Sequence, residues 1–486
     1  MKFPLSPDQV RRSLDAHSAI GLVVGALMYL ICLTGALAAL AESFERWEQP
    51  GVSEFHQVDD TAIANAVTQY RARVDGKPES LWVVLPTREI PRMHVADDEQ
   101  EWFTDAQGNL QAAPVEGWTH MLRELHARLH LPAAFGFIVV SALGVMLIAL
   151  ILSGVLAHPR IFRDAFTLRL GGSRRLEQAD LHNRLSVWGL PFHLMIAVTG
   201  AFYGLVGVLA VAAAAAFFDG DRDALFDAVY GADPVLDAAP VTADPARAMR
   251  ELRRQAPQAE PLYLVIHHMD SRQQFMEVAA RMPGRLAWSE IFRFDAGGTY
   301  LGNQGLTAGP TGRQFLYSLY RIHFGTFGPY ATRIAWALLG LALTVVSVSG
   351  VNIWLSRRGG RDRVDDAWAG LVWGAPLALC LSAFAAVLPA LPALTTFCAV
   401  LAAAVGLALL RRDPLRSAAE LQSLCGLGLL LLSACHWLVH DSAHIDALSH
   451  LVNGALCLGA LTLLALARNN HRRAAQPQLR RAGATA

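Results

Sequence analysis

Eight uninterrupted apolar segments of membrane-spanning length divide this chain. About twenty consecutive apolar residues are needed for a helix to cross the hydrocarbon core of a bilayer. Segments of that length fall near residues 17–41, 133–157, 185–216, 331–355, 368–390, 392–410, 420–439 and 447–467. Of the 486 residues, 53% are hydrophobic and 17% are charged, a composition typical of polytopic membrane proteins. The sequence therefore predicts a mainly α membrane protein with about eight transmembrane helices.

Lysine and arginine residues gather in the short segments on one side of these helices. They lie before the first helix, between the second and third, after the fourth, after the sixth and in the C-terminal tail. Because cytoplasmic loops carry such an excess of positive charge, we expect both termini to lie in the cytoplasm. The two long polar segments, 42–125 and 217–322, then lie on the far side of the membrane, which is the periplasm if the host is a Gram-negative bacterium.

The two polar segments share one order of structural signals. Each has a helix-compatible stretch, at 61–74 and 244–255, followed by strand-like runs such as 81–85 and 262–266. Each then reaches an aromatic strand that leads into an Asp-Ala-x-Gly turn. Alternating apolar residues with turn residues between them are typical of short strands. We therefore expect two small α+β modules.

The first four helices and these modules form two tandem copies of helix, module and helix. Because an even number of crossings separates the copies, both run through the membrane in the same direction. Repeats of that kind are related by an axis along the membrane normal, so equivalent residues should face each other across it. The expected boundaries are a first helix at 1–41, a module at 42–125, two helices with a cytoplasmic loop at 126–216, a module at 217–322, a helix at 323–358, four additional helices at 366–470 and a tail at 471–486.

Histidines occupy matched positions in the two copies. His17 and His182 are each followed, after sixteen intervening residues, by a Thr-Gly pair. His126 and His323 each lead an apolar run that ends in Ser-Gly-Val. Neutral imidazole is the usual axial ligand of membrane cytochromes. The pattern predicts two haem sites, His17 with His182 near the cytoplasmic face and His126 with His323 near the outer face.

Two further histidines are weaker ligand candidates. His193 lies three helical turns beyond His182, and its equivalent in the other copy is Met28. His130 lies one turn beyond His126, and its equivalent is Phe327. Neither has a histidine partner in the repeat, so the case for each is weaker.

The additional helices contain a spaced set of histidines. His436, His440 and His444 are four residues apart, so on a continuous helix they would form one stripe at the outer membrane edge. Such a stripe could bind a divalent metal or a third haem. The alternative is a polar helix end with its loop.

Composition argues against several other kinds of site. The formal net charge is zero, which disfavours nucleic acid as a partner. The six cysteines all lie in apolar runs without CxxC spacing, so we expect neither a disulfide framework nor a thiolate metal site. No nicotinamide or flavin fingerprint occurs in the sequence. Electrons would therefore come from membrane quinol or from a separate cytoplasmic reductase.

An ordered set of short motifs runs through residues 10–358. The stretches are His17-Ser-Ala-Ile-Gly-Leu22, Leu33-Thr-Gly35, Glu124-Leu-His-Ala-Arg-Leu129, Leu152-Ser-Gly154, His158-Pro-Arg160, Asp180-Leu-His182, Tyr320-Arg-Ile-His-Phe-Gly325 and Trp354. In this order they resemble the PepSY-associated transmembrane family, which contains bacterial inner-membrane ferric-siderophore reductases. The resemblance implies PepSY-like modules, b-type haem and electron transfer across the inner membrane to a ferric chelate. The helices after about residue 365 are additional to the simple four-helix members.

The favoured interpretation is an oxidoreductase with two haem b groups that reduces a periplasmic Fe(III) chelate such as a ferric siderophore. One alternative is a siderophore or metal permease, because parallel repeats and eight helices also suit a transporter. A second alternative is a PepSY-type binding or protease-regulatory membrane protein without a redox role. The absorption spectrum of the purified protein distinguishes the first interpretation from the other two.

Overall fold

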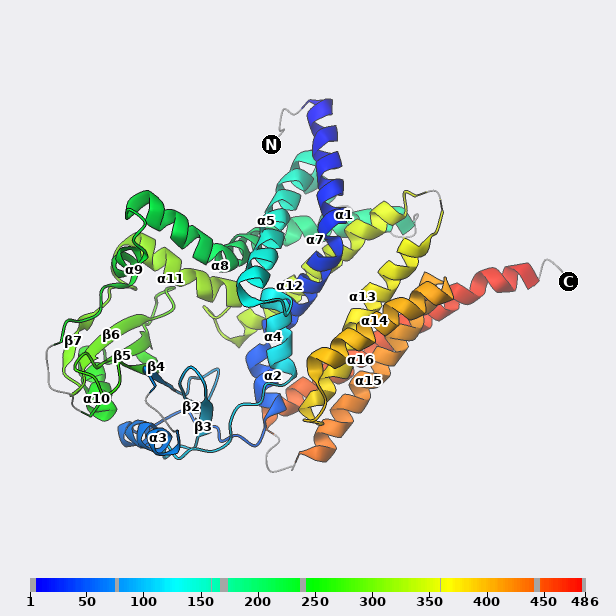
Figure 1. The fold of residues 1–486 in the computed structure, drawn as a ribbon. Helices are drawn as coiled ribbons and strands as arrows, with labels where there is room; N and C mark the ends of the chain where they lie inside the picture. Colours follow the sequence, from blue (N-terminus) through cyan, green and yellow to red (C-terminus); the bar gives the residue numbers. More distant parts are fainter. Residues whose placement is uncertain are drawn as a thin grey trace. The chain divides into compact units, whose positions relative to one another are not determined.

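Figure 1 shows the computed structural model, which describes residues 6–74, 78–158, 160–166, 174–236, 242–358, 360–440 and 446–482. Among the described residues, eight helices are long and apolar enough to cross a membrane, as the sequence predicts. They are α1 (Pro7–Ala38), α5 (Ala133–Ala157), α8 (Leu190–Phe217), α12 (Tyr330–Leu355), α13 (Arg363–Ser382), α14 (Ala393–Arg411), α15 (Pro414–Val439) and α16 (Ala447–Ala482).

The chain divides into two compact units. The first, here called the membrane unit, comprises Met1–Pro50, Glu116–Gly204 and Arg333–Ala486. The second, here called the sheet unit, comprises Gly51–Val115 and Leu205–Thr332. Each unit has its own buried apolar core.

Small residues bring the first four membrane helices together at equivalent places. A Cβ added to Gly144 of α5 would lie 2.9 Å from the backbone nitrogen of Ala201 in α8. A Cβ added to Gly340 of α12 would lie 3.0 Å from the Cβ of Ala36 in α1. Small residues allow helix backbones to approach closely inside a membrane. The matching contacts of α5 with α8 and of α12 with α1 agree with the predicted repeat.

The four C-terminal helices pack side by side and share a core with the first copy (Figure 1). This core includes Leu33 of α1, Leu122 of α4 (Trp118–Arg128) and Leu379 of α13. The buried hydroxyl of Tyr29 donates a 2.6 Å hydrogen bond to the carbonyl of Val372. The additional helices are therefore an integral part of the membrane unit.

A closed ring of buried hydrogen bonds ties α2 (Ala41–Glu48) to α15 and α16. Trp47 Nε1 donates to Asn453 Oδ1 at 3.0 Å, and Asn453 Nδ2 donates to His436 Nδ1 at 3.2 Å. His436 Nε2 then donates to the carbonyl of Trp47 at 2.9 Å, and the two rings are stacked. All three residues are at most 1% exposed, so each polar group depends on the other two.

The sheet unit contains a single antiparallel sheet of seven strands in the order β3-β2-β1-β4-β5-β6-β7. The strands are β1 (Ser80–Val84), β2 (Met93–Ala96), β3 (Glu101–Thr104), β4 (Glu260–His267), β5 (Phe275–Arg281), β6 (Glu290–Asp295) and β7 (Tyr300–Asn303). The two expected modules meet where β1 pairs with β4, for instance through Leu81 opposite Ile266. This pairing leaves neither of these two strands as an open edge. The modules thus form one sheet, which the sequence pattern did not predict.

Helices α3 (Asp60–Arg73) and α10 (Pro245–Gln255) pack on one face of this sheet. Each predicted Asp-Ala-x-Gly turn lies against the helix of its own module. Gly108 and Gly298 have φ angles of +81° and +82°, and an added Cβ would come within 3.0 Å of helix backbone in both turns. Only glycine combines this conformation with such a close approach. On the other face of the sheet, Tyr317 of α11 (Thr311–Phe324) packs against a small apolar cluster that includes Ile291.

We predict that Asn453→Leu destabilises the membrane unit. The substitution leaves Trp47 Nε1 and His436 Nδ1 buried without partners, which costs about 2–4 kcal/mol of unfolding free energy. The expected result is a fall of several degrees in the melting temperature of the detergent-solubilised protein. Thr462→Ala, an exposed hydroxyl on the same helix, serves as the control. Equal melting temperatures for the two variants would contradict the role given to the ring.

Candidate functional site

His17 and His182 lie together in the membrane unit. His17 belongs to α1, and His182 belongs to α7 (Arg174–Trp188), which precedes α8. Their ring centroids are 6.3 Å apart, and the ring planes are inclined at 82°. The structure therefore brings the two members of the predicted inner pair next to each other.

Helix α5 holds the His17 ring through three neighbouring residues. His17 Nδ1 lies 3.0 Å from the carbonyl oxygen of Leu150 and 3.3 Å from Ser153 Oγ. A carbonyl can only accept, so Nδ1 carries the proton and Nε2 keeps a lone pair. Gly154 leaves room for the ring, because an added Cβ would lie 3.1 Å from His17 Cε1.

Helix α12 holds the His182 ring in the same way. His182 Nδ1 lies 3.0 Å from both the carbonyl oxygen of Val346 and Ser349 Oγ. A Cβ added to Gly350 would lie 3.3 Å from His182 Cε1. We call this arrangement an imidazole cradle: a helix carbonyl at one position, a hydroxyl three residues later and a glycine four residues later.

A third imidazole cradle holds His126 of α4. His126 Nδ1 donates to the carbonyl of Ile31 at 3.0 Å, and an added Cβ on Gly35 would lie 2.5 Å from His126 Cε1. Thr34 Oγ1 hydrogen-bonds to the same Ile31 carbonyl. Helix α8 carries the equivalent residues, where Thr199 Oγ1 bonds to the carbonyl of Ile196 at the same distance of 3.3 Å.

Burial favours the neutral form of the His126 and His182 imidazoles. It lowers the pKa of His126, and burial with a smaller contribution from neighbouring His17 lowers the pKa of His182 to about 4. Both rings are then unprotonated at Nε2 at neutral pH. A neutral imidazole is the form that binds a metal.

The residues present fit a haem, whose iron His17 and His182 would hold through their imidazole nitrogens. The separation of 6.3 Å between the ring centroids would leave room for one metal ion between the two rings. An Nδ1 that donates to a backbone carbonyl fixes the tautomer and orientation of such ligands. Both features are present in this pair.

His323 lies in the last turn of α11, in the sheet unit, whereas His126 belongs to the membrane unit. The predicted pairing of these two histidines therefore stays a prediction. It continues to rest on the repeat in the sequence.

The two weaker candidates have different surroundings. His130 Nε2 donates to the carbonyl of Met121 at 2.9 Å. His193 is only 2% exposed, and its Nε2 has no hydrogen-bond partner among the described residues. Its ring folds back over Gly189, where an added Cβ would lie 2.4 Å from Nε2. His193 therefore keeps a free nitrogen, and its role as a ligand stays a hypothesis.

The expected stripe of His436, His440 and His444 does not lie on one continuous helix. Helix α15 ends at Val439, and His440 caps it with extended backbone angles. His444 lies outside the described residues. Both nitrogens of His436 are engaged with Trp47 and Asn453, so this ring has no lone pair left for a metal. Its surroundings favour the alternative of a structural histidine.

Among the described residues, no group of three or more potential metal ligands is arranged to hold an ion.

A polar chain beside the inner pair was missed by the sequence analysis. Trp368 Nε1 of α13 donates to Asn352 Oδ1 at 3.0 Å, and Asn352 Nδ2 donates to Gln178 Oε1 at 3.3 Å. Gln178 lies one helical turn before His182 on α7, and Asn352 lies two residues after Gly350 on α12. The sequence did contain a signal for this chain. Asn352 lies inside a predicted spanning segment, where an asparagine side chain is costly to bury unless it is hydrogen-bonded.

Comparison with known proteins gives a family match over the part of the chain that contains the predicted repeat. The family described as PepSY-associated TM region matches residues 14–357, which run from within α1 to the end of α12 and include both halves of the sheet. A protein of Pseudomonas aeruginosa, named only as uncharacterized, is 29% identical over 250 residues. That match covers 48% of this chain and 64% of the relative, so the chain spans less than two thirds of the relative's length.

The family match covers well over half of the chain, and the four C-terminal helices lie beyond it. The chain is a multi-pass membrane protein that belongs to the family with the PepSY-associated TM region.

Proposed function

We propose that this protein is a haem b-containing electron carrier of the bacterial inner membrane that reduces a periplasmic Fe(III) chelate, of which ferric siderophores are one class. The observation that carries the proposal is the pair of His17 and His182, with ring centroids 6.3 Å apart and each Nδ1 fixed by a helix carbonyl. Haem, when bound, supplies one-electron redox chemistry.

The chain's own residues prepare the inner pair for ligation. The carbonyls of Leu150 and Val346 accept the Nδ1 protons, which leaves both Nε2 lone pairs available. Ser153 and Ser349 hold the Nδ1 sides of the same rings. Because each ring rests on a glycine, it lies against the partner helix without displacing it.

His126 supports a second ligand position, at the opposite end of α1 from His17. It is held by the carbonyl of Ile31, near the C-terminal end of α1, whereas His17 lies near the beginning of the same helix. Fourteen residues separate Ile31 from His17, which corresponds to about 20 Å along a helix axis. Ligand positions at two depths would divide a hydrocarbon core of about 30 Å into shorter electron-transfer distances. The pairing of His126 with His323 is proposed from the sequence repeat.

The overall reaction needs one electron for each iron. Membrane quinol or a separate cytoplasmic reductase supplies that electron, and Fe(III) in the chelate becomes Fe(II). Oxygen ligands of the hard type hold Fe(II) less tightly than Fe(III), so reduction promotes release of the iron. The sheet unit is proposed to hold the chelate on the periplasmic side. Orientation with both termini in the cytoplasm follows from the distribution of lysine and arginine.

We predict that the purified full-length protein shows a Soret band that shifts on reduction with dithionite. His182→Ala and His126→Ala should each remove about half of the haem, because each removes a ligand of a different site. His120→Ala is the matched control, since it removes an exposed histidine from the same helix as His126. A colourless wild-type protein would refute the proposed function, and full haem content in both variants would refute the ligand assignment.

We also predict that Gly350→Leu lowers haem content to about half without unfolding the protein. A side chain at this position would displace the His182 ring, because even a Cβ would lie 3.3 Å from Cε1. Haem content is measured by the pyridine haemochrome spectrum. Gly454→Leu, at an exposed helical glycine with no atom within 4 Å of an added Cβ, should keep the wild-type content. The same haem content in the two variants would argue against the imidazole cradle.

A further inference from the structure

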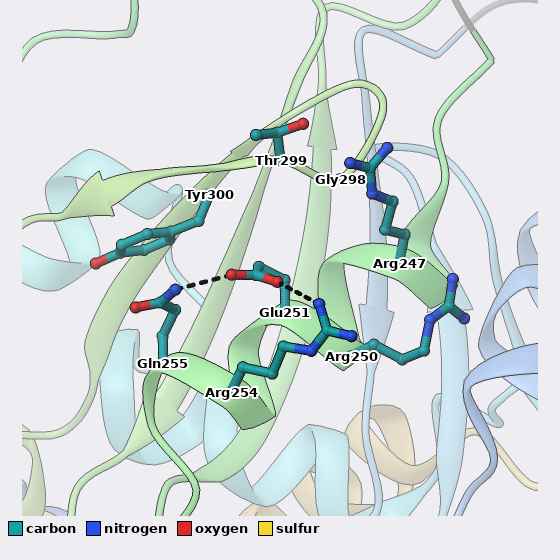
Figure 2. A pocket seen from close by; sticks show the side chains of 8 residues that line it. All are labelled: Arg247, Arg250, Glu251, Arg254, Gln255, Gly298, Thr299 and Tyr300. Carbon is teal, nitrogen blue, oxygen red and sulfur yellow. Dashed lines mark hydrogen bonds and ion pairs between the residues drawn. The ribbon is translucent and has the colours of Figure 1, made fainter.

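A hollow of about 410 Å³ opens on the sheet unit, between α10 and the turn that connects β6 with β7 (Figure 2). Its lining consists of Arg247, Arg250, Glu251, Arg254, Gln255, Gly298, Thr299 and Tyr300. Sites for small molecules have volumes of about 300–1,000 Å³, so the hollow is large enough for a compact chelate.

The walls of this hollow are basic. Arg247, Arg250 and Arg254 lie at positions i, i+3 and i+7 of α10 and therefore share one face of the helix. Figure 2 shows Glu251 between Arg254 and Gln255, with contacts of 3.3 Å and 2.8 Å. Arg247 and Arg250 are exposed and form no salt bridge among the described residues. Two guanidinium groups are thus available to an anion.

Helix α3, the equivalent helix of the first module, has no arginine at the three matching positions. Gly298 packs against the backbone nitrogen of Ala248 as Gly108 packs against that of Ala66, which aligns α10 with α3. In this alignment the three arginines correspond to Asn65, Thr68 and Ala72. The Asn65 side chain bonds within its own module, to the carbonyl of Gln107 and to Asn109. The module fold therefore does not require basic residues on this face.

We propose that this basic hollow binds the anionic Fe(III) chelate, and that the chelates accepted here carry at least two carboxylate groups. The inference rests on the proposed function and names the substrate class for it. Guanidinium groups form paired hydrogen bonds with carboxylate and phosphate oxygens, and the two free arginines can engage two such groups. Phospholipid headgroups share this chemistry, so the experiment has to separate the two sources.

The test uses the detergent-solubilised full-length protein and gallium(III) citrate, an anionic carboxylate chelate that is not reduced. Isothermal titration calorimetry should detect binding, and the Arg247→Ala/Arg250→Ala double variant should bind at least about tenfold more weakly. The control is Arg88→Ala/Arg272→Ala, which removes two exposed arginines of the sheet unit that do not line the hollow. It should keep the wild-type affinity.

Three results would overturn the inference. These are no binding of gallium citrate to the wild-type protein, equal loss in both double variants, or a loss in the first variant confined to binding of anionic phospholipid vesicles. The last result would assign the hollow to lipid headgroups. The haem spectrum of each preparation is recorded in parallel. Intact haem without chelate binding would refute only this inference, whereas absence of haem would refute the proposed function.

Discussion

The membrane unit depends on a hydrogen bond between a histidine Nδ1 and the carbonyl of a neighbouring helix. Inside a helix a carbonyl already accepts one bond, and its second lone pair remains available to an imidazole. This bond fixes the tautomer of His17, His182 and His126, with the proton on Nδ1 of each ring. Because the rings are partly buried, an imidazole without the bond would lose a partner for its N–H group. The serine or threonine and the glycine of each cradle serve this contact.

The four additional helices stabilise the surroundings of these cradles through polar contacts. Tyr29 of α1 bonds to α13, and Trp368 of α13 bonds to Asn352, which bonds to Gln178 on the helix of His182. Polar contacts between membrane helices have a defined geometry, whereas apolar packing tolerates sliding. The C-terminal helices therefore restrain three of the helices that form the inner pair. Their histidine His436 contributes to packing through Trp47 and Asn453.

The two modules of the sheet unit share one framework but differ on one helix face. Both modules use the same helix and the same glycine turn, and they complete each other's sheet where β1 meets β4. This shared framework leaves the outward face of each helix free to differ. In the second module that face is basic, whereas in the first its equivalent positions are uncharged. The asymmetry lies in positions that the fold does not constrain.

The sequence by itself determined the eight spanning helices, the tandem repeat and the matched histidines, because hydrophobic length and spacing are local properties of the chain. It also indicated the glycine turns at Gly108 and Gly298. The tertiary structure decided that Leu150 and Val346 hold the inner pair, that β1 joins β4, and that His436 is occupied by its neighbours. These contacts join residues that are more than one hundred positions apart in the sequence. The exception is the bond between His436 and Asn453. No local pattern specifies such partners, because they depend on which helix faces pack together.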